Sequence, residues 1–345
     1  MSKFNVKNQI GFGALLLLGT TFSILIFNTL FATKVETSFE KIKGISVVGA
    51  PKAISKSSFD PIKLIGANYV SLIPYAFSPK GKAQVITKSN YQWWGETPKG
   101  IIRCKKIADS VGLKTMIKPQ IWRSGGEYTG QLKFETEQDW VEWERQYAEY
   151  IIKFALIADS LNAEMFCIGT ELGASVKARP KYWNYLIDTV KSIYKGQLIY
   201  ASNWDDFKQV PFWNKLDFIG IDAYFPLCES ECDKSEIQRS WKNICADLES
   251  FSSLNKKPII FTEFGYPSAD YALKEPWKTT GSHKNEDLQA LGYDIFFREV
   301  WQQPWLAGIF IWKWFPAPKQ HRIAPNDFTP QGKKALKSLN KGFKP

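Results

Sequence analysis

Histidine is nearly missing from this chain of 345 residues, which has only His283 and His321. Two histidines and no H-E-x-x-H sequence are too few for a multi-histidine centre, so we expect no metal. No G-x-S-x-G elbow is present, which argues against a serine hydrolase of the elbow type. The glycine loops of nucleotide-binding folds are missing too, so we expect no cofactor. These absences narrow the available chemistry to carboxylates.

Signatures of nucleic-acid binding are also missing, although the chain is basic. The net charge is +11 and the isoelectric point is near 9.2, but there is no zinc-finger, RNP or basic-helix pattern. The lysines are spread along the chain and form no basic tract, which is typical of a solvated surface. We therefore expect no nucleic-acid partner. Attraction to an acidic cell surface or polymer is the alternative use of the charge.

Aromatic residues are abundant: they make up 15% of the chain, and 14 of them are tryptophans. Hydrophobic residues make up 44%, enough for a sizeable core. Most of the aromatic side chains are expected to fill that core. The remainder can line a groove, because flat rings stack on the apolar faces of sugars.

Five cysteines are present. Cys104 falls in a predicted helix and Cys167 in a predicted strand, so both are expected to be buried apolar residues. Cys228 and Cys232 bracket a short loop. A disulfide between them is expected if the protein is exported, and free thiols are the alternative.

Apolar or small residues run unbroken from 10 to 27 and, after one interruption, on to 32. Lys3 and Lys7 precede the run. This is long for a signal peptide and close to the length that spans a bilayer. We expect residues 1–33 to be a signal anchor with a transmembrane helix, and 34–44 a linker. The rest would then be exported but membrane-anchored, in the periplasm or at the cell surface. Secretion after signal cleavage is the alternative.

Residues 45–345 alternate between apolar runs typical of buried parallel strands and amphipathic stretches typical of helices. The predicted strands are 45–48, 69–73, 115–119, 165–169, 198–202, 218–221, 258–262 and 307–311. The predicted helices are 61–67, 99–111, 136–161, 182–194, 235–254, 285–301 and 331–339. Eight strands alternating with helices predict a single (β/α)8 TIM barrel. A doubly wound sheet also alternates but usually has fewer strands.

Two of these strands stop at a glutamate, Glu171 in C-I-G-T-E-L and Glu263 in I-I-F-T-E-F-G. The carboxyl end of the strands is where barrel enzymes keep their active sites. Retaining glycosidases need one carboxylic acid to protonate the leaving oxygen and one carboxylate to attack, about 5–5.5 Å away. The two glutamates suit those roles. Taken singly, either one can instead cap a helix or face water.

The same segments carry a family resemblance. G-T-E-L at 169–172 and F-T-E-F-G-Y at 261–266 resemble glycoside hydrolase family 113, the β-mannanase-like barrels of clan A. The resemblance implies that Glu171 is the acid/base and Glu263 the nucleophile. It also implies that Tyr224 hydrogen-bonds the nucleophile and that Trp312 is the platform under the sugar at the cleavage site. At Thr170 the clan commonly has an asparagine that contacts the sugar 2-hydroxyl, so the identity of that sugar is left open.

Further substrate-binding residues are predicted from their positions on the same face. Four tryptophans lie in loops there and are expected either to stack on sugars or to pack the loops: Trp93, Trp94, Trp122 and Trp204. Four polar residues end strands there and are expected either to bind sugar hydroxyls or to make structural hydrogen bonds: Lys118, Gln120, Asn203 and Asp222.

Together these features predict a retaining glycoside hydrolase acting on a β-linked glycan, most simply a β-1,4-mannan. One alternative is an endo-β-glycanase acting on glucan or xylan. Another is a catalytically silent barrel that binds glycan for a surface uptake system. A hydrolase of another class, such as an amidase, is disfavoured by the shortage of histidine.

Overall fold

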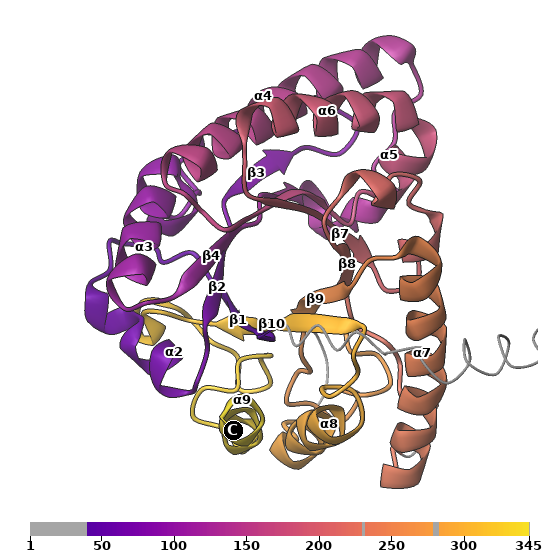
Figure 1. Ribbon diagram of the computed structural model, residues 1–345. Helices are drawn as coiled ribbons and strands as arrows, with labels where there is room; N and C mark the ends of the chain where they lie inside the picture. Colours follow the sequence, from indigo (N-terminus) through magenta and orange to yellow (C-terminus); the bar gives the residue numbers. More distant parts are fainter. Residues whose placement is uncertain (1–39, 230–231, 279–282, 345) are drawn as a thin grey trace, which may run out of the picture. The chain divides into compact units, whose positions relative to one another are not determined.

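Eight parallel strands close into a barrel in the computed structural model, which describes residues 40–229, 232–278 and 283–344 (Figure 1). The strands are β1 (Ile42–Val47), β2 (Tyr69–Leu72), β4 (Lys114–Ile117), β6 (Met165–Thr170), β7 (Gln197–Asn203), β8 (Ile219–Asp222), β9 (Ile259–Phe264) and β10 (Leu306–Trp314). Around the barrel they follow the order β1-β10-β9-β8-β7-β6-β4-β2. The predicted TIM barrel is confirmed.

Helices form the outer ring (Figure 1). They are α2 (Asp60–Leu64), α3 (Pro98–Ser110), α4 (Glu137–Ser160), α5 (Gly173–Ala178), α6 (Pro180–Ile193), α7 (Lys234–Asn255), α8 (Glu286–Glu299) and α9 (Ala335–Phe343). Four of them start at a side chain that accepts a backbone N–H at 2.8 to 3.1 Å: Thr97, Thr136, Asp233 and Asn285. Each such cap stabilises its helix by about 1 kcal/mol. Gly112 lies just beyond α3 with a φ of 71°, the left-handed conformation in which glycine commonly ends a helix.

Two hydrophobic clusters make up the core. The smaller one consists almost wholly of strand residues that face the barrel interior, among them Met165, Cys167 and Ile260. The larger one joins the outer faces of the strands to the helices. The predicted helix at 136–161 is α4, and its apolar stripe is buried there: Trp140, Trp143, Tyr147, Ile151, Phe154 and Ala158. Strands buried on both faces explain why their sequences read as continuous apolar runs.

The first strand begins at Ile42, inside the stretch 34–44 that was predicted to be a linker. Lys41 and Lys43 made this stretch read as polar. Their ammonium groups in fact bond backbone carbonyls of Leu306 and Phe343 at the barrel's amino-terminal end. Ile42, between them, packs in the smaller interior cluster, and the long lysine stems cover the barrel base.

A short parallel pair, β3 (Tyr75–Ser78) and β5 (Gln120–Arg123), was not predicted. Each strand continues the chain beyond a barrel strand, after Pro74 and Pro119 respectively. Proline lacks the N–H that a strand ladder needs, so each proline separates the extension from its barrel strand. The extensions carry Tyr75, Gln120 and Trp122 to the carboxyl end of the barrel.

Cys228 and Cys232 form a disulfide, which was one of the two alternatives left open. Cys104 and Cys167 are free and buried, as predicted. By backbone contacts the chain divides into Met1–Glu40 and Lys41–Pro345, and every element named above belongs to the second unit. The predicted anchor at 1–33 lies outside the described residues, and none of the helices within them is long and apolar enough to cross a membrane.

Candidate active site

Both predicted glutamates lie at the carboxyl rim of the barrel. Glu263 is the next-to-last residue of β9, and Glu171 directly follows β6. The ladder between β8 and β9 shifts register between Ile221 and Asp222, so that Asp222 pairs with Glu263. Such an irregularity re-aims side chains where a strand ends. Thr262 and Glu263 therefore both reach neighbouring polar groups inside the rim.

Three donors hold the Glu263 carboxylate: Lys118 and Gln120, which follow β4, and Tyr224, which follows β8. Lys118 Nζ lies 2.5 Å and Gln120 Nε2 2.7 Å from Oε1. The Tyr224 hydroxyl donates to Oε2 at 2.7 Å. The Glu263 side chain is only 8% exposed. Charge-assisted bonds of this kind are short and strong, and they fix the orientation of a carboxylate.

Lys118 also bonds Asp222, at 3.1 Å, and both side chains are fully buried. Thr262 donates to the same Asp222 oxygen at 2.7 Å. Burial, then the charge of Glu263, raises the pKa of Asp222 to about 7, while Lys118 opposes the shift. Burial would lower the pKa of Lys118, but Asp222 and Glu263 outweigh it and raise that pKa. Lys118 and Asp222 form an ion-paired support beneath Glu263.

Of the two alternatives left open for Lys118 and Asp222, the structure shows structural hydrogen bonds rather than side chains available to sugar hydroxyls. Both side chains are fully buried, so neither can contact a ligand. A buried charge needs an oppositely charged or hydrogen-bonding partner, and here each side chain is a partner of the other. Gln120, predicted in the same set, donates to Glu263 but keeps partial exposure. Asn203 donates to Asp205 at 2.7 Å at the surface, and Thr170 is buried at the end of β6.

Glu171 has a different environment. Its backbone φ is 52°, a left-handed conformation that costs a residue with a side chain about 1 kcal/mol, and its N–H bonds Ala201 O at 2.8 Å. Within the described ranges no side chain hydrogen-bonds its carboxyl. Burial raises the pKa of Glu171 well above its ordinary value, and the charges of Asp222 and Glu263 raise it further. Lys118 opposes the shift.

An aromatic cavity of about 460 Å³ opens beside the ends of β1, β2 and β10. Three of the predicted tryptophans line it: Trp93, Trp122 and Trp312. Trp93 is 41% and Trp122 54% exposed, and exposed apolar side chains that gather in one groove often mark a binding site. Trp94 instead packs against the core. Trp204 stacks on Trp277, with ring centroids 5.7 Å apart.

Tyr75, Glu96 and His321 also line the aromatic cavity, and none of them was predicted. Glu96 lies in a short loop turn and has no periodic pattern around it, so nothing in the sequence separates it from a solvated loop residue. Tyr75 follows a proline beyond the predicted strand. An apolar run that resumes after Pro74 was the available signal for Tyr75.

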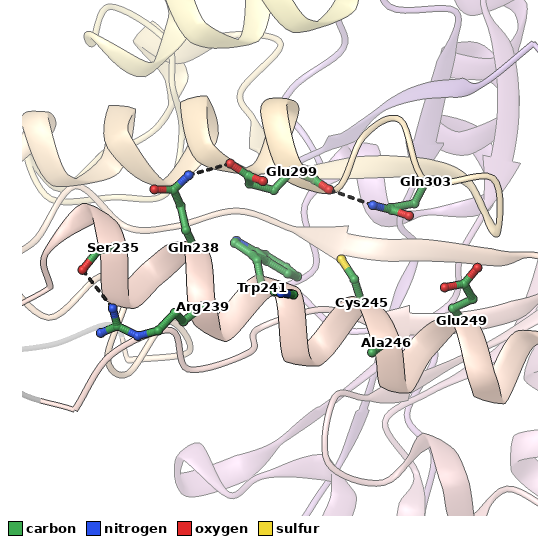
Figure 2. Close-up of a pocket in the computed structure, with 10 residues that line it drawn as sticks. Ser235, Gln238, Arg239, Trp241, Cys245, Ala246, Glu249, Glu299 and Gln303 are labelled. Carbon is green, nitrogen blue, oxygen red and sulfur yellow. Dashed lines mark hydrogen bonds between the residues drawn. The ribbon is translucent and has the colours of Figure 1, made fainter.

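A second cavity, of about 540 Å³, lies between α7 and α8 on the outside of the barrel (Figure 2). Gln238 of α7 donates to Glu299 of α8 at 2.7 Å across it. Glu249 lies exposed on the same face of α7. None of the predicted site residues lines this cavity, so Glu249 is a suitable position for control substitutions away from the rim.

Replacing Lys118 with methionine is expected to lower the free energy of unfolding by about 3–5 kcal/mol, because the buried carboxylates of Asp222 and Glu263 lose the cation that pairs with both. Lys105→Met is the matched control. The Lys105 side chain is 3% exposed, but its carboxylate partners are 50% and 33% exposed and stay solvated without it. Urea unfolding followed by tryptophan fluorescence compares the two variants. Equal losses would contradict the proposed support beneath Glu263.

Comparison with known proteins agrees with this geometry. Residues 51–333 match the model of Glycoside Hydrolase Family 113. The GH113 β-mannanase AaManA from Alicyclobacillus acidocaldarius has a TM-score of 0.77 at 22% identity, over 89% of this chain and 98% of that chain. A GH113 β-1,4-mannanase has a TM-score of 0.75 at 22% identity, over 88% and 99%. A β-glucuronidase from Faecalibacterium prausnitzii has a TM-score of 0.59 at 14% identity, over 88% and 48%.

At these identities the solved structures show the fold alone, and among curated proteins no sequence match was found. The family model is the stronger finding, because it spans most of the chain and includes both glutamates. The chain belongs to glycoside hydrolase family 113 and is a glycoside hydrolase.

Proposed function

We propose that this protein is a retaining β-mannanase that cleaves β-1,4-mannan-type glycans by double displacement. The contrast between its two rim glutamates carries the proposal. The Glu263 carboxyl group accepts hydrogen bonds from three donors, whereas Glu171 has a raised pKa and no side-chain donor among the residues described. Two carboxyl groups with such different surroundings suit different roles, one as a nucleophile and the other as a general acid. The family's two structural relatives above are named as mannanases, which supports the choice of sugar.

In the first step, the carboxylate of Glu263 attacks the anomeric carbon while the proton of Glu171 passes to the glycosidic oxygen. The leaving sugar departs as an alcohol, and a covalent glycosyl ester remains on Glu263. In the second step, Glu171, now a carboxylate, takes a proton from water, and the resulting hydroxide equivalent displaces Glu263. Two inversions leave the anomeric configuration unchanged, and Glu171 is again protonated.

Neighbouring residues support both steps. Tyr224 keeps one oxygen of Glu263 oriented, and Lys118 with Gln120 keeps the other. Trp312, at the border of the aromatic cavity, provides a flat apolar surface for the sugar whose bond is broken. The roles of Tyr224, Lys118 and Gln120 follow from their contacts with Glu263, and the role of Trp312 follows from the clan pattern.

A screen of mannan, glucan and xylan with product sizing tests the proposal. We expect soluble oligosaccharides from mannan, and proton NMR should show the β-anomer as the first product. An α-anomer appearing first would exclude double displacement. Release of oligosaccharides from glucan or xylan but not from mannan would change the proposed sugar. Thr170 bears on this choice, because the clan commonly has at its position an asparagine that contacts the sugar.

We also propose that the barrel works outside the cytoplasm. The Cys228–Cys232 disulfide supports this, because disulfides persist in oxidising compartments. Cell fractionation distinguishes a membrane-anchored from a secreted form. Protein found in the soluble fraction with a processed amino terminus would overturn the anchor predicted at 1–33.

A further inference from the structure

Basic residues are distributed unevenly around the amino-terminal end of the barrel. In the strand order, β9, β10, β1, β2 and β4 lie side by side, with β1 in the middle (Figure 1). From the last turn of each preceding helix to the second residue of these strands, and at the end of α9, there are nine basic residues but three acidic ones. The same segments before β6, β7 and β8 contain three of each. Positive charge is therefore concentrated on one side of this end.

We call the lysines on this side the basic arc. Two of the acidic residues beside them already have partners: Asp109 pairs with Lys105 at 2.5 Å, and Glu299 pairs with Arg298 at 2.8 Å. None of the eight lysines of the basic arc forms an ion pair with a residue that the structure describes. Besides Lys41 and Lys43, they are Lys63, Lys114, Lys256, Lys257, Lys341 and Lys344.

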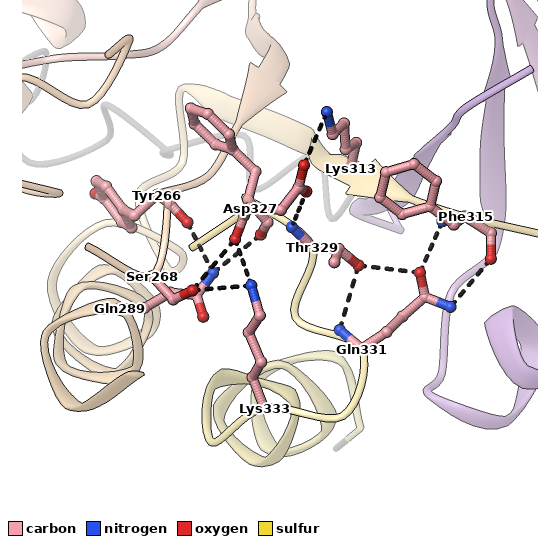
Figure 3. Close-up of polar contacts among 10 residues, drawn as sticks. Tyr266, Ser268, Gln289, Lys313, Phe315, Asp327, Thr329, Gln331 and Lys333 are labelled. Atoms are coloured by element: carbon pink, nitrogen blue, oxygen red, sulfur yellow. Dashed lines mark hydrogen bonds and ion pairs between the residues drawn. The ribbon is translucent and has the colours of Figure 1, made fainter. Parts of the chain in front are cut away.

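The contacts that these lysines do make leave their charge in place. Lys63 Nζ donates to Gly112 O at 3.1 Å, and the lysines that flank Ile42 likewise bond backbone carbonyls. A carbonyl oxygen orients an ammonium group but has no net charge with which to neutralise it. At the opposite end of β10, by contrast, Lys313 is matched by the Asp327 carboxylate at 3.3 Å (Figure 3). The basic arc therefore carries a positive charge that needs an external counterpart.

Two exposed leucines lie among these lysines. Leu64 ends α2 next to Lys63 and is 72% exposed, and Leu254 is 81% exposed near the end of α7, two positions before Lys256. A single exposed leucine needs no explanation. Leucines set between lysines, however, are the pattern with which proteins lie on a membrane surface, because the leucines enter between the head groups while the ammonium groups meet phosphates.

The chain enters the barrel in the middle of the basic arc, where Glu40 leads into β1. The apolar run that was predicted to span a bilayer ends at residue 32, eight residues earlier. Eight residues of extended chain reach at most about 29 Å. If the run crosses a membrane, the basic arc is therefore held close to the membrane surface. Glu171 and Glu263 lie at the other end of the strands.

We propose that the basic arc docks on a membrane surface that contains anionic phospholipid, with lipid phosphates as the counter-charges of its lysines. Each lysine near such a surface strengthens the attraction roughly fivefold. Leu64 and Leu254 add apolar contact between the head groups. In this orientation the carboxyl rim points away from the membrane, toward a glycan outside it. The docking concerns lipid alone, so it goes beyond the proposed function and does not depend on which glycan is cleaved.

A fluorescent probe on the full chain in lipid bilayers tests the docking. Leu254→Cys, labelled with the dye NBD, reports contact of the basic arc with lipid, and Ala53→Cys reports the exposed loop at the other end of β1. The native cysteines are buried or disulfide-bonded, so the introduced thiol reacts. We expect a blue shift at position 254 in phosphatidylcholine mixed with phosphatidylglycerol, and none in pure phosphatidylcholine. Position 53 should respond in neither.

Charge reversal gives a second readout. Lys63→Glu combined with Lys344→Glu changes two exposed lysines of the basic arc, and we expect the ratio of docked to undocked protein to fall roughly 30-fold. Lys52→Glu combined with Lys56→Glu makes the same change in charge at two exposed positions after β1 and should leave the ratio unaltered. Salt of about 1 M, where the Debye length is about 3 Å, should release the wild type. All four lysines lie outside the active site, so hydrolysis of a soluble glycan should continue in both variants.

Three outcomes would overturn the inference. The first is an equal response at position 254 in neutral and anionic lipid, and the second is an equal effect of the two pairs of substitutions. The third is a stronger response at position 254 to soluble polyphosphate than to the anionic bilayer, which would assign the basic arc to an acidic polymer. Chain that is recovered in soluble form is titrated with vesicles of the same two compositions, and the same expectations hold.

Discussion

Glu263→Gln is expected to abolish turnover, lowering kcat by about four orders of magnitude or more on every glycoside. The amide has the same shape and can still contact Tyr224 and Gln120, but it cannot form the glycosyl ester. The loss should be the same for substrates with good and poor leaving groups, because attack is needed in either case. Initial rates on mannan and on a dinitrophenyl glycoside measure it.

Two controls make this result specific to the nucleophile. Glu249→Gln makes the same chemical change at an exposed position of α7, and this variant should keep the wild-type rate. Glu263→Ala opens space at the anomeric carbon, and added azide should restore turnover with a glycosyl azide of inverted configuration. Near-wild-type hydrolysis by Glu263→Gln, or an azide product of retained configuration, would remove Glu263 from the nucleophile role.

Glu171→Gln is expected to show a loss that depends on the leaving group. On mannan the rate should again fall by about four orders of magnitude, because the sugar alkoxide cannot leave without a proton. On a dinitrophenyl glycoside the burst that reports glycosylation should persist, because that leaving group needs no proton. A loss of equal size on the two substrates would contradict the acid/base assignment.

The pH profile provides an independent check on Glu171. Its raised pKa keeps the acid protonated at pH values where an ordinary glutamate is ionised. For mannan hydrolysis, wild-type kcat/KM should therefore fall as the pH rises through that pKa. On the dinitrophenyl glycoside, whose leaving group needs no proton, neither the wild type nor Glu171→Gln should show this basic limb. A basic limb that survives the substitution would belong to another group, such as Asp222, whose pKa is raised to about 7.

Much of the fold was predictable because barrel strands are buried on both faces. Continuous apolar runs at eight places predicted the strands, and the α4 stripe predicted a helix that packs on them. The prediction failed where this logic has exceptions. Lys41 and Lys43 flank a genuine strand residue, Ile42, and hide the start of β1. Prolines interrupt the two strands whose extensions become β3 and β5.

The candidate site was predictable in part. Its glutamates end apolar runs, and that pattern is visible in one dimension. The fate of the polar residues around them is not, because a lysine at a strand end reads the same whether it meets a sugar or a carboxylate. Lys118 meets Asp222 and Glu263, which lie 104 and 145 positions away along the chain. Glu96 and Tyr75 enter the aromatic cavity through similar long-range packing.

Local pattern was therefore enough for most of each barrel strand and for the two glutamates, because burial on a strand depends on near neighbours. Closure of the barrel was needed to pair Lys118 with its carboxylates, to leave Glu171 without a donor, and to place Trp93 and Trp122 in a cavity while Trp94 and Trp204 pack elsewhere. Those outcomes depend on which remote side chains share a small volume of low polarity, where each charge must find its match.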